Sequence, residues 1–89
     1  MVYEPENNRS AAYDDGKEIG ESTFSVMKNV WFLNHTYVKR VYEGQGIGGK
    51  LVLELVNQAR KENVKIMPVC SFVKKEFDEK PEYSDVLTN

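Results

Sequence analysis

The stretch Gly44-Gln45-Gly46-Ile47-Gly48-Gly49 joins a strand-like segment to a helical one. Glycine gives up side-chain packing and loses more backbone freedom on folding than other residues. Four glycines in six residues are therefore expected where the main chain comes very close to something. The N–H groups of such a loop, with the partial positive charge of the helix N-terminus behind it, suit a phosphate or diphosphate. The stretch predicts a site for a phosphorylated ligand.

The segments on either side of the glycines predict a strand, a helix and a second strand. Apolar residues recur at the spacing of one helical face across residues 46–62, and Asn63 suits the left-handed residue that ends a helix. Alternation predicts a strand over residues 30–38, and an apolar run predicts another over 64–69. This order implies a right-handed crossover between parallel strands. Bulky side chains on both faces of residues 30–38 predict a central strand that is covered on both sides.

The N-terminal half has the pattern of antiparallel strands. Residues 9–13 and 17–27 favour strands, and Asp14-Asp15-Gly16 between them is typical of a hairpin turn. Gly20 marks a weak point or a bulge in the second strand. Lys28-Asn29 predicts another tight turn.

The two ends of the chain carry weaker signals. Residues 1–7 show no periodicity and are expected to form a loose tail. Ser71 is expected to cap a helix that runs to about Asp78, and Pro81 should interrupt it before a final turn or short helix over 82–87. The elements add up to a single α+β domain over residues 1–89, with an antiparallel hairpin, one central crossover and a closing helix. The expected aromatic core consists of Phe24, Trp31, Phe32 and Phe72.

Composition limits the chain to one small globular domain. It has 89 residues, of which 40% are apolar and 29% charged, and a net charge of -2. Its basic residues are scattered, which argues against nucleic-acid binding, and no apolar run approaches the roughly 18 residues that would span a membrane. The single Cys70 fits a reducing compartment, so a cytoplasmic location is expected. Nothing indicates an oligomeric state, and no cluster has metal-ligand spacing.

The glycine run alone allows two other interpretations. The glycines could simply permit a tight strand-to-helix turn. Gly44, Gly46 and Gly49 also match the GxGxxG fingerprint of dinucleotide-binding folds, which expects the turn directly after its strand and an acidic residue at the end of the next strand. Here residues 39–43 intervene and the next strand ends at Val69-Cys70, without an acid. The chain is also too short for two mononucleotide-binding halves.

Three motifs add a more specific indication. Residues 35–49 read HTYVKRVYEGQGIGG, residues 68–73 read PVCSFV, and residues 81–87 read PEYSDVL. The first is similar to the cofactor-binding segment of the GNAT superfamily of acetyltransferases, in which a strand ending in valine leads to a glycine-rich helix start. Together the motifs resemble a sub-group of very small GNAT-like proteins, which carry an HT-x-V strand, a GQGIG loop, a P-x-C-x-F junction and a PEY-x-D-x-L tail. The similarity runs from about residue 30 to residue 87.

The resemblance implies a minimal GNAT-like fold and a binding site for acetyl-CoA. In that family two parallel strands splay apart, and the pantetheine arm lies between them. The backbone of Val38 would bind this arm or polarise the thioester carbonyl, which suits an N–H that stabilises oxyanion charge. The main-chain N–H groups that would hold the diphosphate belong to Gln45, Gly46, Ile47, Gly48 and Gly49.

The chain departs from the family pattern at two points. The family motif begins with Arg or Gln, whereas this chain has Glu43, whose carboxylate is unfavourable beside a diphosphate unless it points away or Lys39 or Arg40 compensates. The helices that shape the acceptor site in longer relatives are also missing, because the chain passes from a hairpin straight to the central strand. The acceptor side is therefore expected to be open, incomplete or finished by a partner.

Few side chains are candidates for the chemistry. His35 is the only histidine and is the residue type best suited to act as a base near neutral pH, although a histidine on a central strand is more often a structural residue. Cys70 follows the strand that should flank the thioester, where its thiolate would accept the acetyl group, or it is simply a small buried hydrophobe. Tyr83 would serve as an acid or anchor the tail by packing. Glu21 is a further candidate base if its strand faces the cleft. Lys74 and Lys75 are expected to form a solvated helix face, with phosphate contacts as the alternative.

Three functions remain open. The first is a minimal N-acetyltransferase that binds acetyl-CoA and passes the acetyl group directly to a primary amine of a small molecule or protein. The second is a non-catalytic acetyl-CoA-binding or CoA-binding sensing module, which Glu43 and the missing helices favour. The third is an interaction protein whose glycine turn is structural and which pairs through an exposed strand edge at residues 9–13.

Overall fold

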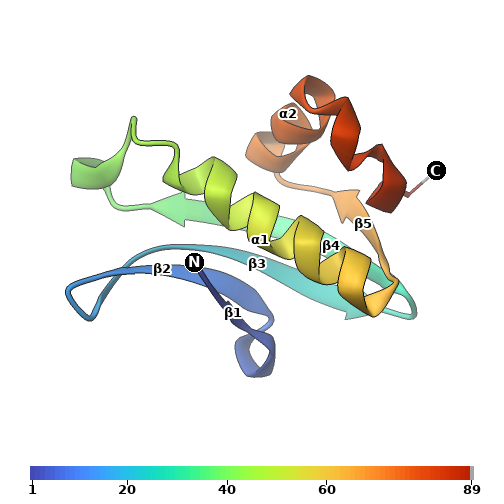
Figure 1. The fold of residues 1–89 in the computed structure, drawn as a ribbon, viewed down its shortest axis with the longest axis horizontal. Coiled ribbons are helices and arrows are strands. Elements are labelled where there is room, and N and C mark those ends of the chain that lie inside the picture. The colour runs from blue at the N-terminus through green and yellow to red at the C-terminus, as the bar shows by residue number, and fades with distance from the viewer. Residues whose placement is uncertain (89) are drawn as a thin grey trace.

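The structure is a computed structural model that describes residues 1–88. Within these residues, five strands form one mixed sheet, and both α-helices pack on the same face of it (Figure 1). In chain order the elements are β1 (Val2–Glu4), η1 (Pro5–Asn7), β2 (Arg9–Asp14), β3 (Lys17–Met27), β4 (Val30–Val38), η2 (Arg40–Tyr42), α1 (Ile47–Glu62), β5 (Lys65–Pro68), α2 (Ser71–Glu79) and η3 (Pro81–Val86), where η denotes a 3-10 helix. Strands β1 to β4 are antiparallel neighbours, and β5 lies parallel to β4 across the α1 crossover. The predicted α+β architecture is therefore confirmed. Neither α-helix within this range has the length and apolar character needed to cross a membrane.

Turn residues fix the ends of the antiparallel strands. Asp15 and Gly16 have φ values of 51° and 78° between β2 and β3, and Lys28 has a φ of 56° between β3 and β4. These left-handed turns match the right-handed twist of the flanking strands. Both β3 and β4 occupy the predicted residues. Asn63, with a φ of 58°, ends α1 in the predicted left-handed conformation.

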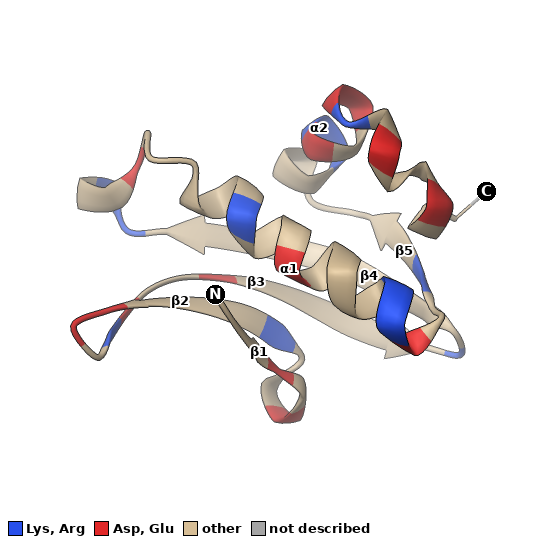
Figure 2. Ribbon diagram, in the orientation of Figure 1, with Lys and Arg blue, Asp and Glu red and all other residues tan. Residues whose placement is uncertain are grey.

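The C-terminal segment closes the helical layer. The N-cap of α2 is Cys70 rather than the predicted Ser71, and the Cys70 side chain makes no capping hydrogen bond. Pro81 opens η3, which confirms the predicted interruption. Arg60 near the end of α1 pairs with Asp85 of η3 at 2.8 Å, so a basic and an acidic segment meet where the two elements approach (Figure 2).

The N-terminal residues form ordered structure instead of the expected loose tail. Val2–Glu4 is a strand that pairs with β2. Tyr3 stacks on Trp31 with 6.0 Å between ring centroids and donates a hydrogen bond to Glu62 of α1 at 3.0 Å. The prediction for residues 1–7 was wrong because these contacts are remote in sequence. Residues 9–13 are consequently not a free edge, and the interaction hypothesis loses the strand on which it was built.

The core lies between the sheet and the two helices. Phe24 and Trp31 stack with centroids 4.3 Å apart, which confirms two of the four predicted core aromatics. Burying a side chain of this kind contributes about 1.5–3 kcal/mol. Phe32 is only half-buried, and Phe72 is 37% exposed, so neither belongs to this core. The largest fully buried apolar side chains are Leu33, Leu51, Leu55, Ile66, Val52, Val56 and Val73.

The other face of the sheet is open within residues 1–88, so the predicted cover on both sides of β4 was wrong. A β-bulge also breaks the expected alternation along this strand. Leu33 and His35 pair with consecutive residues of β3, which leaves Asn34 as an extra residue. His35 therefore lies on the open face, whereas Thr36 and Val38 lie on the helix side.

Candidate functional site

Strands β4 and β5 separate halfway along β4. Their pairing begins at Val30 with Lys65 and ends at Leu33 with Pro68. The N–H groups of Val69 and Cys70 then both donate to the carbonyl oxygen of Leu33, at 3.0 and 3.1 Å, as the chain turns into α2. Beyond this point β4 continues to Val38 without β5 beside it. The predicted splay of the parallel strands is thus present.

The unpaired edge of β4 presents main-chain groups to the space that β5 leaves. The N–H of Lys39 donates to Ile19 on the β3 side at 2.8 Å. Because successive residues of an antiparallel strand point their polar groups to alternate sides, the N–H of Val38 points away from β3. This N–H therefore points into the gap between β4 and β5, where the resemblance to GNAT proteins implies a donor to the pantetheine arm or the thioester carbonyl.

A cleft of about 600 Å³ extends from the splay to the glycine loop. Its walls come from the end of β4, from η2 and the loop after it, from the first turns of α1, and from α2 and η3. A volume of this size lies within the usual range for small-molecule sites. The lining residues are Thr36, Val38, Tyr42, Glu43, Gly44, Gly46, Ile47, Gly48, Gly49, Lys50, Leu53, Phe72, Glu76, Lys80 and Tyr83.

The glycine loop is open toward this cleft. Gly44 and Gly46 have φ values of 82° and 77°, and a Cβ added to either would meet nothing within 4 Å. The first hydrogen bond of α1 runs from the N–H of Lys50 to Gly46 at 3.1 Å. The three preceding N–H groups, at residues 47–49, therefore have no partner within the helix, and the N-cap side chain supplies none. Free N–H groups at a positive helix end form an anion-binding arrangement.

Gly48 and Gly49 have a different role. A Cβ on Gly48 would lie 2.8 Å from Cζ of Phe72, and a Cβ on Gly49 would lie 3.1 Å from Oε1 of Glu76. These two glycines allow α2 to approach the first turn of α1. The glycine run therefore combines an open loop with a close helix–helix contact.

Charged side chains of both signs line the cleft. Glu43, the departure from the family motif, is exposed on its wall, as is Lys50. Glu76 is only 8% exposed and accepts a hydrogen bond from Lys80. Lys74 and Lys75 are exposed and do not line the cleft, which fits the solvated helix face and not the phosphate contacts.

Sequence reasoning missed three residues of α2 and its C-terminal end that form one wall of the cleft. Phe72, Glu76 and Lys80 follow one another at intervals of four residues, which places them on one side of the helix. This spacing was a usable signal. Its meaning depended on knowing which side of α2 faces α1, and the sequence alone does not give that.

The structure places the proposed binding and catalytic residues at four positions. Five of the six proposed cofactor-binding residues line the cleft, while Gln45 lines a smaller hollow of about 320 Å³ beside β2. Tyr83 lines the cleft as well. Cys70 is half-buried, with its Sγ 3.9 Å from Oγ1 of Thr36. His35 lies on the opposite face of the sheet. The five are Val38, Gly46, Ile47, Gly48 and Gly49.

Tyr83 is held by packing and stays neutral. Its ring meets that of Phe77 edge to face, with centroids 5.4 Å apart, and the residue is 4% exposed. Burial raises the pKa of the Tyr83 phenol above its usual value, because the phenolate would be poorly solvated there. The phenol therefore keeps its proton at neutral pH.

Thr36 connects the cleft to a buried hydroxyl. Its Oγ1 lies 3.1 Å from Oγ of Ser22, which is fully buried in β3. The same Oγ1 lies 3.9 Å from the sulfur of Cys70. Thr36 thus has a fixed polar neighbour behind it and the thiol beside it, at the point where the strands separate.

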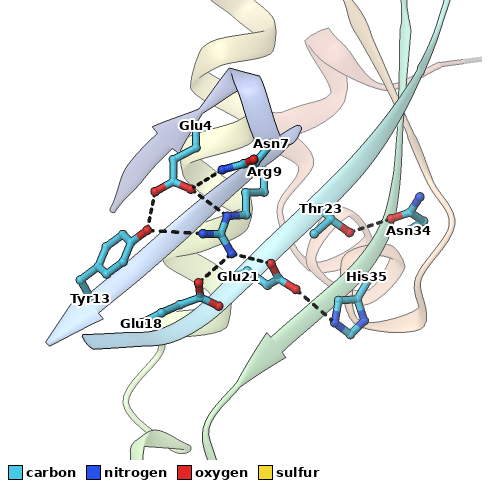
Figure 3. Close-up of polar contacts among 9 residues, drawn as sticks. All are labelled: Glu4, Asn7, Arg9, Tyr13, Glu18, Glu21, Thr23, Asn34 and His35. Atoms are coloured by element: carbon cyan, nitrogen blue, oxygen red, sulfur yellow. Dashed lines mark hydrogen bonds and ion pairs between the residues drawn. The ribbon is translucent and has the colours of Figure 1, made fainter. Parts of the chain in front are cut away.

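The open face of the sheet carries a polar network around Arg9 (Figure 3). The Arg9 guanidinium contacts Glu4, Glu18 and Glu21, each at 2.8 Å. Nε2 of His35 lies 3.8 Å from Oε2 of Glu21, which is an ion-pair distance only when the imidazole is protonated. Glu21 therefore faces away from the cleft and is not a base within it.

The splayed strand pair and the glycine-rich helix start define this protein as GNAT-like in fold. A sequence model of the family described as GCN5-related N-acetyl-transferase matches residues 9–86. A GCN5-like protein of Staphylococcus aureus, solved by NMR, is 32% identical with a TM-score of 0.77, and the match covers 100% of this chain and 88% of that one. The chain therefore belongs to the GCN5-related N-acetyltransferase family. No curated protein sequence matches it.

Two further similar structures contain a ligand. A GNAT family acetyltransferase from Brucella melitensis in complex with acetyl-CoA is 26% identical with a TM-score of 0.59, covering 73% of this chain and 48% of that one. The PaiA N-acetyltransferase of Thermoplasma acidophilum in complex with coenzyme A is 28% identical with a TM-score of 0.58, covering 61% and 34%. The match thus spans less than half the length of these two proteins.

Proposed function

We propose that this protein binds acetyl-CoA in the cleft and transfers the acetyl group to a primary amine of a small molecule or protein. The observation that carries the proposal is the continuity of the cleft from the unpaired edge of β4 at Val38 to the free N–H groups at the start of α1. One end suits an uncharged pantetheine arm, and the other suits a diphosphate. The ligands of the two similar complexes support the same assignment.

The residues at the helix start fit a diphosphate through main-chain groups. Gly44 and Gly46 leave open space where other residues would place a Cβ, and the N–H groups of residues 47–49 are free to donate. Lys50 supplies a positive side chain on the same wall. Glu43 opposes binding, but it is exposed and its carboxylate can turn into solvent. We infer that the main chain supplies most of the affinity for the phosphates.

Direct transfer requires a base for the amine and an acid for the leaving sulfur. The amine nitrogen attacks the thioester carbonyl carbon, the carbon–sulfur bond breaks, the nitrogen loses a proton, and the sulfur gains one. We assign stabilisation of the carbonyl oxygen to the N–H of Val38 and proton donation to Tyr83, whose phenol remains neutral. We assign the base to His35, which does not line the cleft but lies on the open face two residues beyond the last β4–β5 pair at Leu33, so that it acts only on an amine that enters between the strands from that face.

Calorimetric titration with acetyl-CoA and CoA tests binding, and release of free CoA in the presence of amines and peptides tests transfer. Tyr83→Phe and His35→Gln should each lower turnover by about a hundredfold, since acid–base groups contribute about 10²- to 10⁴-fold. Acetyl-CoA affinity should stay unchanged in both. Full turnover in either variant would remove that residue from the mechanism, and absence of binding at millimolar acetyl-CoA would refute the proposal as a whole.

Cys70 provides a covalent alternative to direct transfer. In this route its thiolate attacks the thioester, CoA leaves, and the acetyl group passes from the Cys70 sulfur to the amine. The thiol is half-buried beside Thr36, which lines the cleft. An acetylated Cys70 in intact mass spectra, together with loss of turnover in Cys70→Ser, would support this route. Unchanged turnover in Cys70→Ser would exclude it.

The second candidate function is a non-catalytic module that binds acetyl-CoA or CoA. Two observations favour it. Glu43 stands on the cleft wall, and β1 and β2 are joined only by the short η1, so no helix shapes an acceptor site on the open face within residues 1–88. Acetyl-CoA binding without amine-dependent CoA release would establish this function. Release that depends on an amine would exclude it.

A further inference from the structure

A buried carboxylate stands in the wall of the cleft. Glu76 is 8% exposed, and glutamate is seldom buried to this degree unless it is paired. Its partner is Lys80, one turn later on α2, which donates a hydrogen bond to it. Both side chains line the cleft. Position and burial therefore separate Glu76 from the other glutamates of α2 and its surroundings, which lie at the surface.

Glu76 lies against the same helix start that we assign to the diphosphate. Its Oε1 is 3.1 Å from the Cβ position of Gly49, the third residue of α1. The positive end of α1 stabilises a carboxylate there. A phosphorylated ligand at this helix end would meet a negative charge that is already in place. The two like charges repel, and burial weakens the screening between them.

Lys80 offsets this charge. Its side chain is 35% exposed, so the ammonium reaches both Glu76 and the open cleft. The hydrogen bond to Glu76 raises the pKa of Lys80 and keeps it protonated. The charged groups on the cleft wall are Glu43, Lys50, Glu76 and Lys80, two of each sign, so their formal charges cancel.

We propose that Glu76 limits the affinity of the cleft for its phosphorylated ligand and that Lys80 offsets this repulsion, so that the pair holds the affinity at an intermediate level. The inference rests on the proposed function, since it concerns the same site. A cleft with no excess positive charge binds phosphates chiefly through main-chain N–H groups. Its affinity for acetyl-CoA and for the product CoA is lowered together, because both carry the same diphosphate.

The test is a double-mutant cycle of Glu76 and Lys80, in which the affinity for CoA is measured by calorimetry at low salt. Glu76→Gln removes the repulsion at nearly constant shape and should tighten binding about tenfold, which is the order expected of one partly screened charge. Lys80→Met should weaken binding about tenfold. The double variant restores the charge balance and should bind like the wild type. Lys80→Arg keeps the charge and should also bind like the wild type.

Two exposed residues of α2 provide matched controls. Glu79→Gln and Lys75→Met make the same charge changes on the same helix but away from the cleft, and should leave CoA affinity unchanged. High salt should shrink the differences within the cycle, because screening weakens charge effects and leaves packing effects intact. Thermal melting establishes that each variant is folded.

The outcomes separate the two proposals. Absence of CoA binding in the wild type would overturn the proposed function, and this inference with it. Wild-type binding that Glu76→Gln fails to tighten would overturn this inference alone. A double variant as weak as Lys80→Met would show that Lys80 contacts the ligand for itself rather than offsetting Glu76, which would also overturn it.

Discussion

The assignment of the diphosphate to the glycine loop can be tested by Gly46→Ala, because the chain offers a control glycine with nearly the same φ. Gly46 has a φ of 77° and Gly16 has a φ of 78°, and a Cβ added to either meets nothing within 4 Å. Gly46 lines the cleft, whereas Gly16 lies in the turn between β2 and β3. Both substitutions therefore place a Cβ at a similar positive φ in open space, and they differ in whether the new methyl group faces the cleft.

The expected loss of stability follows from that strain. A residue with a Cβ in the left-handed region costs about 1–2 kcal/mol, and neither site adds a steric clash. For a domain of this length, each kcal/mol lowers the melting temperature by roughly 4–8 °C. Gly46→Ala and Gly16→Ala should thus unfold at similar temperatures, both below the wild type and both well above the temperature of the binding assay.

The binding results should differ sharply. A methyl group on Gly46 projects into the space where we place the diphosphate, and a lost hydrogen bond to a charged group costs about 1.5–3 kcal/mol. Such a loss corresponds to a change of about tenfold or more in the dissociation constant. CoA affinity measured by calorimetry should therefore fall by that factor in Gly46→Ala and should not change in Gly16→Ala. Equal CoA affinity in the two variants would show that the ligand does not approach the loop, and the assignment of the diphosphate would then be wrong.

Three further predictions concern stability. Gly20→Ala should lower the free energy of unfolding, measured by urea denaturation, by about 2–3 kcal/mol, because the new Cβ would lie 2.8 Å from the main-chain oxygen of Tyr37, which is fixed in β4. A loss below about 0.5 kcal/mol would contradict this. Arg60→Ala should lower the urea midpoint of unfolding slightly, because it removes the exposed two-pronged contact with Asp85 and the bond to the carbonyl oxygen of Glu82. Arg60→Lys should recover little of the loss, since only the guanidinium makes both bonds to Asp85, and full recovery would contradict this. Burial raises the pKa of the Tyr3 phenol from 10.0 to about 12, so its contribution to folding stability is complete below pH 10 and is lost as the pH rises toward 12. Tyr3→Phe should remove that part of the pH dependence of the unfolding free energy, and an unaltered pH profile would count against this explanation.

The elements that the sequence predicted well are those with local signals. The limit between β2 and β3 follows from Asp15-Gly16, residue types that tolerate positive φ, and the limit between β3 and β4 falls at the predicted Lys28-Asn29 turn, where Lys28 itself has a φ of 56°. The helix after the glycine run follows from its apolar period, and Asn63 marks its end. Each of these signals lies within a few residues of the feature that it determines.

The elements that the sequence did not predict depend on contacts between remote residues. Residues 1–7 have no pattern of their own, and Tyr3 is held by Trp31 and Glu62. The bulge at Asn34 inserts one residue into β4, which moves every later side chain to the other face. This single feature explains why His35 lies away from the cleft although alternation placed it beside Leu33. The cleft wall on α2 was missed for the same kind of reason, since its position depends on how α2 meets α1.

The geometry of the glycine run weighs against a purely structural turn. Gly48 and Gly49 are accounted for by packing, because Phe72 and Glu76 occupy the space that their side chains would need. Gly44 and Gly46 are not: both have positive φ, and neither has an atom within 4 Å of its Cβ position. Gly16 in the turn between β2 and β3 has the same open space and a similar φ, so these two features alone do not indicate a ligand. Gly44 and Gly46 differ from Gly16 because they line the cleft beside the free N–H groups at the start of α1, and that position is the physical reason for placing the diphosphate there.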